Sequence, residues 1–315
     1  MSLRLPAVPP GPWREEYPFE PNYIELGSSR ALHYADVGQG PPVVMLHGNP
    51  TWSFMYRELI KNLTGYRRLA LDQMGMGLSS RPGPDYGYTL AERIADFGLW
   101  IDSLSLTEPI HLIVHDWGGP VGLGWAGANP DRVATLTIMN TGLKIPKGYN
   151  LPWKLALFKR SLFLGRFFAT DLNLFVHGVI RYGTQRPMSP AVRDGYLAPY
   201  RKAAHRRALS GFVFDIPLRN THPSHAKLAE VYENFSRLSN KPTLYAWGLK
   251  DFVFSNGFLD DFTRDRPLAD VLALPLAGHC LLEDEPEAIL RSVSGLLEGG
   301  RFFPSLLAGA QLERP

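Results

Sequence analysis

The sequence contains only one cysteine, Cys280, among its 315 residues. A single thiol excludes a disulfide framework within the chain and any metal site built from several cysteines, and it suits a reducing cytoplasm, where we expect the protein to reside. No apolar run is long enough to span a bilayer, and the first residues lack the continuous apolar segment of a secretory signal. We therefore expect neither an integral membrane segment nor a cleaved leader.

Charge of one sign is also scarce. The chain carries 33 Lys and Arg against 30 Asp and Glu, spread along its length, for a net charge of +3. Without a basic block, nucleic acid is not an expected partner. The chain has no internal repeat or low-complexity segment. Its 45% apolar and 20% charged content is typical of a globular protein with a sizeable core.

What the sequence does have is a regular alternation of strand and helix patterns. Helical patterns separate most of the strands, and such alternation implies right-handed crossovers and a mainly parallel sheet covered by helices on both faces. We therefore predict an α/β fold with an eight-stranded, mostly parallel sheet. The predicted strands cover residues 23–26, 31–37, 42–46, 68–71, 110–114, 133–139, 243–247 and 271–274.

The alternation stops between residues 143 and 220, which are helical in character and rich in Phe, Leu and Arg. This pattern predicts a helical cap over 143–220, inserted into a core made of 1–142 and 221–315. Apolar and basic residues interleave over 154–168, which predicts amphipathic helices suited to an apolar substrate. Several prolines in residues 1–21 predict an extended arm on the surface.

The central motif runs from Ile113 to Gly119: an apolar strand, then His115 and Asp116, then two glycines that open a helix. This is the outline of a nucleophile elbow, in which a sharp turn between strand and helix exposes one reactive side chain. Asp116 stands where serine is usual. The alternative role for this aspartate is that of a helix N-cap beside a tight turn.

Polar residues that follow the other strands are expected at the same edge of the sheet, where ligands bind in such folds. Asn49 follows one strand, Trp117 adjoins the elbow, Asp251 follows a later strand, and His279 follows the last one. Nucleophile, acid and histidine thus occur in the order of an α/β-hydrolase triad. A turn aspartate and a structural histidine are the alternative interpretations of Asp251 and His279.

Several of these motifs together resemble the haloalkane dehalogenase family of α/β-hydrolases over about residues 20–298. The resemblance implies an α/β-hydrolase fold and neither a cofactor nor a metal. The motifs are His47-Gly48-Asn49-Pro50-Thr51, Asp72-x-x-Gly75-Met76-Gly77-x-Ser79, His115-Asp116-Trp117-Gly118-Gly119 and Gly278-His279.

The resemblance also implies a role for each site residue. Asp116 would attack an sp3 carbon and expel halide, which the side-chain amide of Asn49 and the indole N–H of Trp117 would hold. His279, oriented by Asp251, would activate water against the alkyl ester, with the backbone N–H groups of Asn49 and Trp117 as the oxyanion hole. Chemistry favours aspartate here, because water can hydrolyse an alkylated aspartate, whereas alkylated serine would be a dead-end ether.

The position of the acid separates the subfamilies. One group has a glutamate where this chain has Asn140, so Asp251 is the better assignment. This arrangement resembles the third subfamily, which includes the bacterial β-lactone decarboxylases of olefin biosynthesis, and the cap motif from Gly195 to Tyr200 is similar to theirs. The chain departs from that pattern at His205, where an asparagine before the arginine is typical.

Hydrolytic dehalogenation is the first functional interpretation, and β-lactone decarboxylation, which would use the same nucleophile, is the alternative. An epoxide hydrolase would need cap tyrosines, for which Tyr182, Tyr196 and Tyr200 are candidates, but Asn49 argues against it. A binding protein without turnover is the fourth interpretation. We expect a small apolar substrate, and the sequence leaves open a second copy of the chain or other lipid-processing enzymes as partners.

Overall fold

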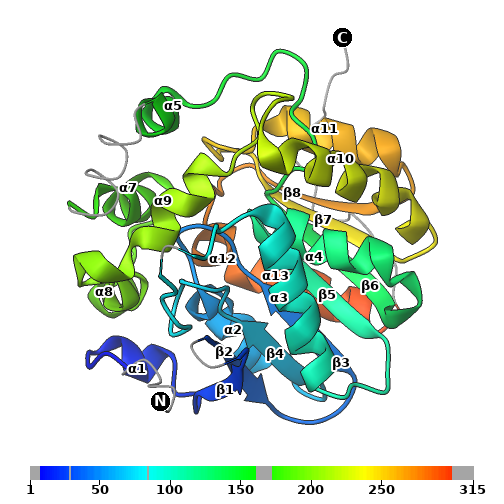
Figure 1. Ribbon diagram of the computed structural model, residues 1–315. Helices are drawn as coiled ribbons and strands as arrows, with labels where there is room; N and C mark the ends of the chain where they lie inside the picture. Colours follow the sequence, from blue (N-terminus) through cyan, green and yellow to red (C-terminus); the bar gives the residue numbers. More distant parts are fainter. Residues whose placement is uncertain (1–7, 28–29, 84, 161–171, 300–315) are drawn as a thin grey trace.

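The computed structural model describes residues 8–27, 30–83, 85–160 and 172–299 (Figure 1). Within them, one sheet of eight strands has the order β1-β2-β4-β3-β5-β6-β7-β8. The β1–β2 and β2–β4 pairs are antiparallel and the other pairs are parallel, so the predicted mostly parallel sheet is confirmed. The strands are Asn22–Glu25 (β1), Ala31–Val37 (β2), Pro42–Leu46 (β3), Arg67–Leu71 (β4), Ile110–His115 (β5), Val133–Met139 (β6), Thr243–Gly248 (β7) and Asp270–Leu274 (β8).

The central strands are apolar on both faces because helices cover both sides of the sheet. In β3, Val44 and Leu46 belong to one core cluster, while Val43 and Met45 belong to the other. Successive side chains of a strand point to opposite faces, so this one apolar run supplies both cores. The register pairs Val44 with Leu69 of β4 and Leu112 of β5.

The helices divide between the two faces in the same way. α3 (Leu90–Ser103), α4 (Gly118–Ala128), α10 (Pro223–Phe235) and α11 (Asn256–Asp265) contribute side chains to the first cluster, whereas α2 (Arg57–Asn62) and α13 (Pro286–Leu297) contribute to the second. α3 begins with a capping box: Thr89 accepts the N–H of Glu92, whose carboxylate accepts the N–H of Thr89. Such a cap contributes about 1 kcal/mol and sets where the helix starts.

A group of helices lies between β6 and β7 in the chain. Figure 1 draws them in green and yellow-green on the left, apart from α3, α4 and α10. Their helical character agrees with the expected cap, while its boundaries at 143 and 220 stay a prediction. Part of the segment expected to be amphipathic, residues 161–171, lies outside the described residues. The helices are α5 (Trp153–Arg160), α7 (Leu174–Tyr182), α8 (Pro190–Leu197), η4 (Ala198–Tyr200), η5 (Ala203–His205) and α9 (Arg207–Phe214).

The prediction of an extended N-terminal arm is wrong for residues 13–16, which form the short helix α1 (Trp13–Glu16) next to α8 (Figure 1). Trp13 is only 1% exposed, and its ring packs edge-on against Trp52 with centroids 5.3 Å apart. Burying a side chain of this size contributes about 3 kcal/mol. The prolines suggested an extended surface arm, but the burial of Trp13 holds this segment against the core. Residues 1–7 of the expected arm and leader region lie outside the described part.

Two short elements complete the fold. The 3-10 turn η1 (Ser53–Tyr56) precedes α2, and the helix α12 (Leu281–Asp284), which the sequence pattern did not predict, follows β8. In the described parts of the chain, no helix combines the length and the apolar character needed to cross a membrane.

Candidate active site

The turn between β5 and α4 holds Asp116 in a left-handed conformation, with a φ of +49°. The N–H of Asp116 donates to the carbonyl of Asn140 at 3.1 Å, and the hydroxyl of Thr141 donates to the carbonyl of Asp116 at 2.6 Å. On the other side, a Cβ on Gly118 would lie 1.9 Å from the carbonyl oxygen of Leu46. Close contacts on both sides thus sustain the strained turn that a nucleophile elbow needs.

The carboxylate of Asp116 is buried, with 6% of the residue exposed. Its Oδ2 accepts the N–H of Asn49 at 2.6 Å, and the N–H of Trp117 also donates to the carboxylate. Burial raises the pKa of Asp116 to about 6, while the opposing influences of His279 and the two N–H groups limit the rise. When ionised, this carboxylate is poorly solvated and therefore reactive.

His279 and Asp251 form a buried hydrogen-bonded pair. The Nδ1 of His279 lies 2.9 Å from Oδ2 of Asp251, whose Oδ1 accepts the N–H of Val253 at 2.7 Å. Because a carboxylate only accepts, Nδ1 carries the proton and Nε2 is left as the base. Burial lowers the pKa of His279, but the charge of Asp251 and the hydrogen bond between them raise it above 6.5 overall. This arrangement orients the ring and stabilises its protonated form.

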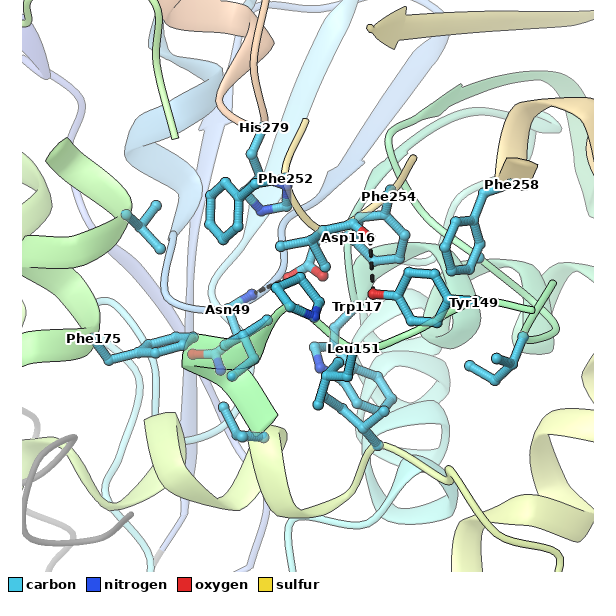
Figure 2. Close-up of a pocket in the computed structure, with 18 of the residues that line it drawn as sticks. Asn49, Asp116, Trp117, Tyr149, Leu151, Phe175, Phe252, Phe254, Phe258 and His279 are labelled. Carbon is cyan, nitrogen blue, oxygen red and sulfur yellow. Dashed lines mark hydrogen bonds between the residues drawn. The ribbon is translucent and has the colours of Figure 1, made fainter. Parts of the chain in front are cut away.

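The ring of His279 is enclosed by aromatic neighbours. The ring of Phe254 stacks on it with a centroid distance of 6.0 Å. On another side, His115 packs at 4.7 Å and donates from Nε2 to the carbonyl of His279 at 2.8 Å. Figure 2 shows Phe252 and Phe254 beside the imidazole. Such surroundings exclude water except where the cavity opens.

Asn49 and Trp117, the expected anion-binding pair, both line the cavity next to Asp116 (Figure 2). The Nδ2 of Asn49 donates one N–H to the carbonyl of Leu209 at 3.1 Å. That acceptor sets the orientation of the amide and leaves the second N–H of Nδ2 for a ligand. Asn49 therefore has one N–H to offer to a ligand in the cavity that Trp117 also lines.

Asn140 occupies the position where one dehalogenase subfamily has its acid. The side chain of Asn140 instead cross-links two strands: Nδ2 donates to the carbonyl of Gly248 at 3.1 Å, and Oδ1 accepts the N–H of Gly248 at 2.8 Å. With both amide groups engaged, Asn140 is a structural residue. The acid beside His279 is Asp251.

Asp116, His279, Asn49 and Trp117 meet at one cavity of about 770 Å³. This volume lies in the upper part of the range of about 300–1,000 Å³ for ligand sites. Most of the lining is apolar and comes from both the sheet edge and the helices between β6 and β7. Leu155, from the segment predicted to be amphipathic, is part of this lining. Residues that the sequence pattern did not single out include Tyr149, Leu151, Phe175, Gly178, Val179, Val213, Phe252, Phe254 and Phe258.

Trp153 and the three tyrosines that an epoxide hydrolase would need lie at the rim of the cavity or outside it. Trp153 lines the mouth and is 72% exposed, which does not suit an anion ligand. Tyr182 is also at the mouth and half exposed. The hydroxyl of Tyr196 donates to Glu283 at 2.6 Å, and that of Tyr200 donates to the carbonyl of Thr51 at 3.4 Å. Neither of these two tyrosines lines the cavity.

Asp284, on the unpredicted helix α12, holds the loop that carries the histidine. Its Oδ2 accepts the N–H of Gly278 at 2.8 Å, while its Oδ1 accepts the N–H groups of Gln185 and Arg186 at 2.8 and 2.9 Å. One buried carboxylate thus links the His279 loop to the segment after α7. The acidic pair after Gly278-His279 was visible in the sequence, but Gln185 and Arg186, which donate to Asp284, lie about a hundred residues away in the chain.

No cluster of three or more His, Cys, Asp or Glu side chains suited to a metal ion occurs among residues 8–27, 30–83, 85–160 and 172–299. Cys280 is buried beside His279, and burial raises the pKa of its thiol well above the ordinary value. A thiol that is protonated and buried in this way is unsuited to act as a nucleophile.

Comparisons with known proteins agree with this geometry. A family model described as "alpha/beta hydrolase fold" matches residues 41–180. A cis-3-alkyl-4-alkyloxetan-2-one decarboxylase of Xanthomonas campestris is 37% identical over 90% of this chain and 97% of its own length. Haloalkane dehalogenase 2 of Mycobacterium bovis is 33% identical over 88% of this chain and 94% of its own. The solved structure of a haloalkane dehalogenase from Agrobacterium tumefaciens superposes with a TM-score of 0.80 at 26% identity, covering 89% of this chain and 96% of that one.

Proposed function

The chain belongs to the α/β-hydrolase family that contains the haloalkane dehalogenases and the cis-3-alkyl-4-alkyloxetan-2-one decarboxylases, and on this premise we propose that it is a β-lactone decarboxylase. Its substrate would be a β-lactone with an alkyl chain on each of two adjacent ring carbons, and its products a long-chain cis-alkene and carbon dioxide. The observation that carries the proposal is the buried carboxylate of Asp116 facing a large apolar cavity.

The preference over dehalogenation, which the sequence alone ranked first, comes from the relatives. Two decarboxylases, from Xanthomonas campestris and Shewanella oneidensis, are each 37% identical to this chain over about nine tenths of its length, against 33% for the dehalogenase. A two-chain lactone also suits a cavity whose walls are mostly apolar.

In the first step, an oxygen of the Asp116 carboxylate attacks the ring carbon that bears the lactone oxygen. The new C–O bond forms as the ring C–O bond breaks, and its electron pair leaves on a free carboxylate. Relief of ring strain drives this step, and the N–H donors of Asn49 and Trp117 stabilise the anion in surroundings that exclude water. The product is an ester of Asp116 that carries the released carboxylate on the next carbon.

In the second step, this ester fragments. The bond between the neighbouring carbon and its carboxylate breaks, its electrons form the double bond, and Asp116 leaves as carboxylate. The products are an alkene and carbon dioxide, and neither water nor a proton is consumed. Inversion in the first step followed by anti elimination in the second converts a cis-lactone to a cis-alkene.

Hydrolytic dehalogenation is the second candidate, and a specific observation favours it. Fragmentation requires no base, yet His279 is hydrogen-bonded to Asp251 and lines the same cavity as Asp116. With a haloalkane, Asp116 would displace halide, and Nε2 of His279 would take a proton from the water that attacks the ester carbonyl. The backbone N–H groups of Asn49 and Trp117 would hold the resulting oxyanion.

The epoxide hydrolase interpretation has less support, because the hydroxyls of Tyr196 and Tyr200 are engaged away from the cavity. A scaffold that only binds ligand would yield no product from any of these substrates.

The test is a pair of assays on one preparation: alkene release from a cis-dialkyl-β-lactone, and halide release from 1-bromo- and 1-iodoalkanes. We expect the larger kcat/KM with the lactone. Halide release with no alkene would refute decarboxylation and leave dehalogenation standing. His279→Phe separates the two chemistries further, since it should stop haloalkane turnover but leave lactone fragmentation measurable.

A further inference from the structure

Arg93 is a buried cation that lies directly behind the proposed anion-binding tryptophan. It is only 2% exposed, although it stands in the first turn of α3. Its guanidinium carbon lies 4.1 Å from the ring centroid of Trp117 and 4.1 Å from that of Phe212. Those two rings meet edge to face, with centroids 6.0 Å apart. The cation is therefore in contact with both aromatic rings.

Polar groups at the ends of two helices hold this guanidinium in place, and a third helix supports one of them. On its own helix, Nε donates to the carbonyl of Thr89 at 3.3 Å. Nη2 forms an ion pair with Oδ2 of Asp215, at the end of α9. Oδ1 of Asp215 in turn accepts the hydroxyl of Ser224, on α10, at 2.5 Å. Contacts from α3 and α9, the second supported by α10, thus fix the charge relative to Trp117.

A buried ion pair is a poor source of stability, because desolvation offsets the attraction of the charges. Apolar residues would serve packing equally well, so the charge invites another explanation. A cation over the face of an indole polarises the ring and leaves its N–H edge more positive, which strengthens a hydrogen bond from that N–H to an anion. Of the ion pair, the guanidinium is the member that contacts the ring.

We propose that Arg93 is a positioning residue for Trp117: it locks the indole and increases the ability of its N–H to hold an anion, while Asp215 moderates the charge. The inference rests on the proposed function, in which that anion is the carboxylate freed from the lactone or a halide. Arg93 itself touches neither substrate nor the reacting atoms. It acts through the aromatic ring in front of it.

Substitutions of the two partners of the ion pair should change anion affinity in opposite directions. A purely structural role of the pair would not produce opposite changes. Arg93→Met keeps the bulk and removes the charge, so anion affinity should fall about tenfold. Asp215→Asn leaves the cation uncompensated, so anion affinity should rise several-fold, although the protein loses stability. Arg93→Lys keeps the charge and should retain more affinity than Arg93→Met. If Arg93→Met fails to fold, the comparison of Arg93→Lys with Asp215→Asn still decides the sign.

The probe is sodium bromide, with binding followed by saturable quenching of tryptophan fluorescence. Trp153 is 72% exposed and would be quenched by collision, so all variants carry Trp153→Phe. Trp117→Phe is the control that should remove the saturable component. Circular dichroism at the assay temperature checks that each variant is folded.

Weaker binding in Arg93→Met together with tighter binding in Asp215→Asn supports the inference. Equal affinities, or a loss in both variants, overturn it. Lactone and haloalkane turnover by the unsubstituted protein is measured in parallel, so that failure of this inference and failure of the proposed function give different results. No saturable bromide binding in the unsubstituted protein would refute the anion site, and the inference with it.

Discussion

At the scale of single residues, Asp116 carries two unfavourable features at once. It has a left-handed φ of +49°, and its carboxylate is buried in a cavity with mostly apolar walls. Backbone N–H groups of Asn49 and Trp117 compensate the charge only in part, since the pKa is still raised to about 6. The protein therefore sacrifices stability at this position for a carboxylate that is reactive once ionised.

The raised pKa of Asp116 predicts a pH dependence. Only the ionised carboxylate attacks, so kcat/KM for lactone decarboxylation should rise with pH, reach half its limit at about pH 6 and then level off. Initial rates of alkene release across the acid and neutral range measure this profile. Haloalkane hydrolysis should need a higher pH than lactone decarboxylation, because His279 must be neutral and its own pKa is raised. A single inflection near 3.8, the ordinary value for aspartate, would contradict the prediction.

Replacing Asp116 by asparagine should inactivate the protein and increase its stability. Asp116→Asn keeps an acceptor for the N–H of Asn49, and asparagine tolerates the left-handed backbone. The substitution also removes the buried charge. The rise in the pKa of Asp116 from 3.8 to about 6 corresponds to a destabilisation of roughly 3 kcal/mol by that charge. The variant should melt higher than the wild type at neutral pH. Because the folded pKa is raised, the difference should grow as pH rises from about 4 to about 6 and vanish below that window.

Differential scanning fluorimetry across that window measures the effect, with Asp116→Ala as the matched control. Alanine also removes the charge, but it disfavours a positive φ and loses the hydrogen bond, so it should gain less. A lower melting temperature for Asp116→Asn at neutral pH would show that the carboxylate is stabilising after all. Mass spectrometry of the purified variant guards against deamidation back to aspartate.

Sequence reasoning brought together candidate residues where chain order alone decides their position. Asp116, Asp251 and His279 each follow a parallel strand, and such strands end at one edge of the sheet, so their side chains were expected together. Arg93 and Asp284 reach the site through tertiary packing. Their partners, Trp117 for one and Gln185 for the other, are distant in the chain, and no local pattern marks those contacts.

At the scale of elements, the elbow depends on how closely α4 approaches β3. A Cβ on Gly118 would lie 1.9 Å from the carbonyl oxygen of Leu46, and one on Gly48 would lie 2.2 Å from Oδ2 of Asp116. The first neighbour is backbone within the central sheet, which cannot move aside. Glycine at the start of α4 is therefore required by the space between helix and strand, whatever side chain the elbow presents.

This contact predicts that Gly118→Ala destabilises the protein by about 3 kcal/mol or more, as overpacking does in a rigid core. Chemical denaturation measures the change, and alkene release should fall as Asp116 is displaced. The control is Gly295→Ala in α13, where a Cβ would meet nothing within 4 Å. That control should stabilise by about 0.5–1 kcal/mol. Equal stability of the two variants would mean that α4 has room to shift.

The elements that sequence patterns predicted are those with strong periodicity. Apolar runs located the eight strands of the sheet. The failures, α1 and α12, are helices of four residues each. A helix that short has no full period to recognise and forms because neighbours hold its ends, as the packing of Trp13 holds α1.

At the scale of the whole molecule, the site belongs to neither the sheet nor the helices beside it. The sheet edge supplies Asp116 and His279, whereas α7 supplies much of the apolar wall. Asp284 joins the two parts through Gly278 and Gln185. We therefore expect chemistry and substrate choice to depend on different parts of the fold, so that each can be changed without the other.

Gly178 on α7 offers a test of that separation. It lines the cavity, and a Cβ there would meet nothing within 4 Å. Gly178→Leu should fill the space that an alkyl chain occupies and lower kcat/KM for long-chain substrates about tenfold or more, while short-chain substrates are unaffected. The melting temperature should not fall, because glycine inside a helix is itself unfavourable.

Competition between long- and short-chain substrates in one vessel measures the ratio directly, with Gly178→Ala as the smaller step. A uniform loss for every chain length would contradict the prediction. It would indicate that α7 moves, or that the alkyl chains occupy a different part of the cavity.

The central claim is that Asp116 forms a covalent bond to the substrate, and trapping that bond is its most direct test. His279→Phe is incubated with a 1-iodoalkane, and the protein is digested for peptide mass spectrometry. We predict an alkyl adduct on Asp116, formed in step with iodide release and absent when Asp116→Asn is added to the same chain. An unmodified Asp116 while the iodoalkane is consumed, or an adduct on a different side chain, would contradict the mechanism.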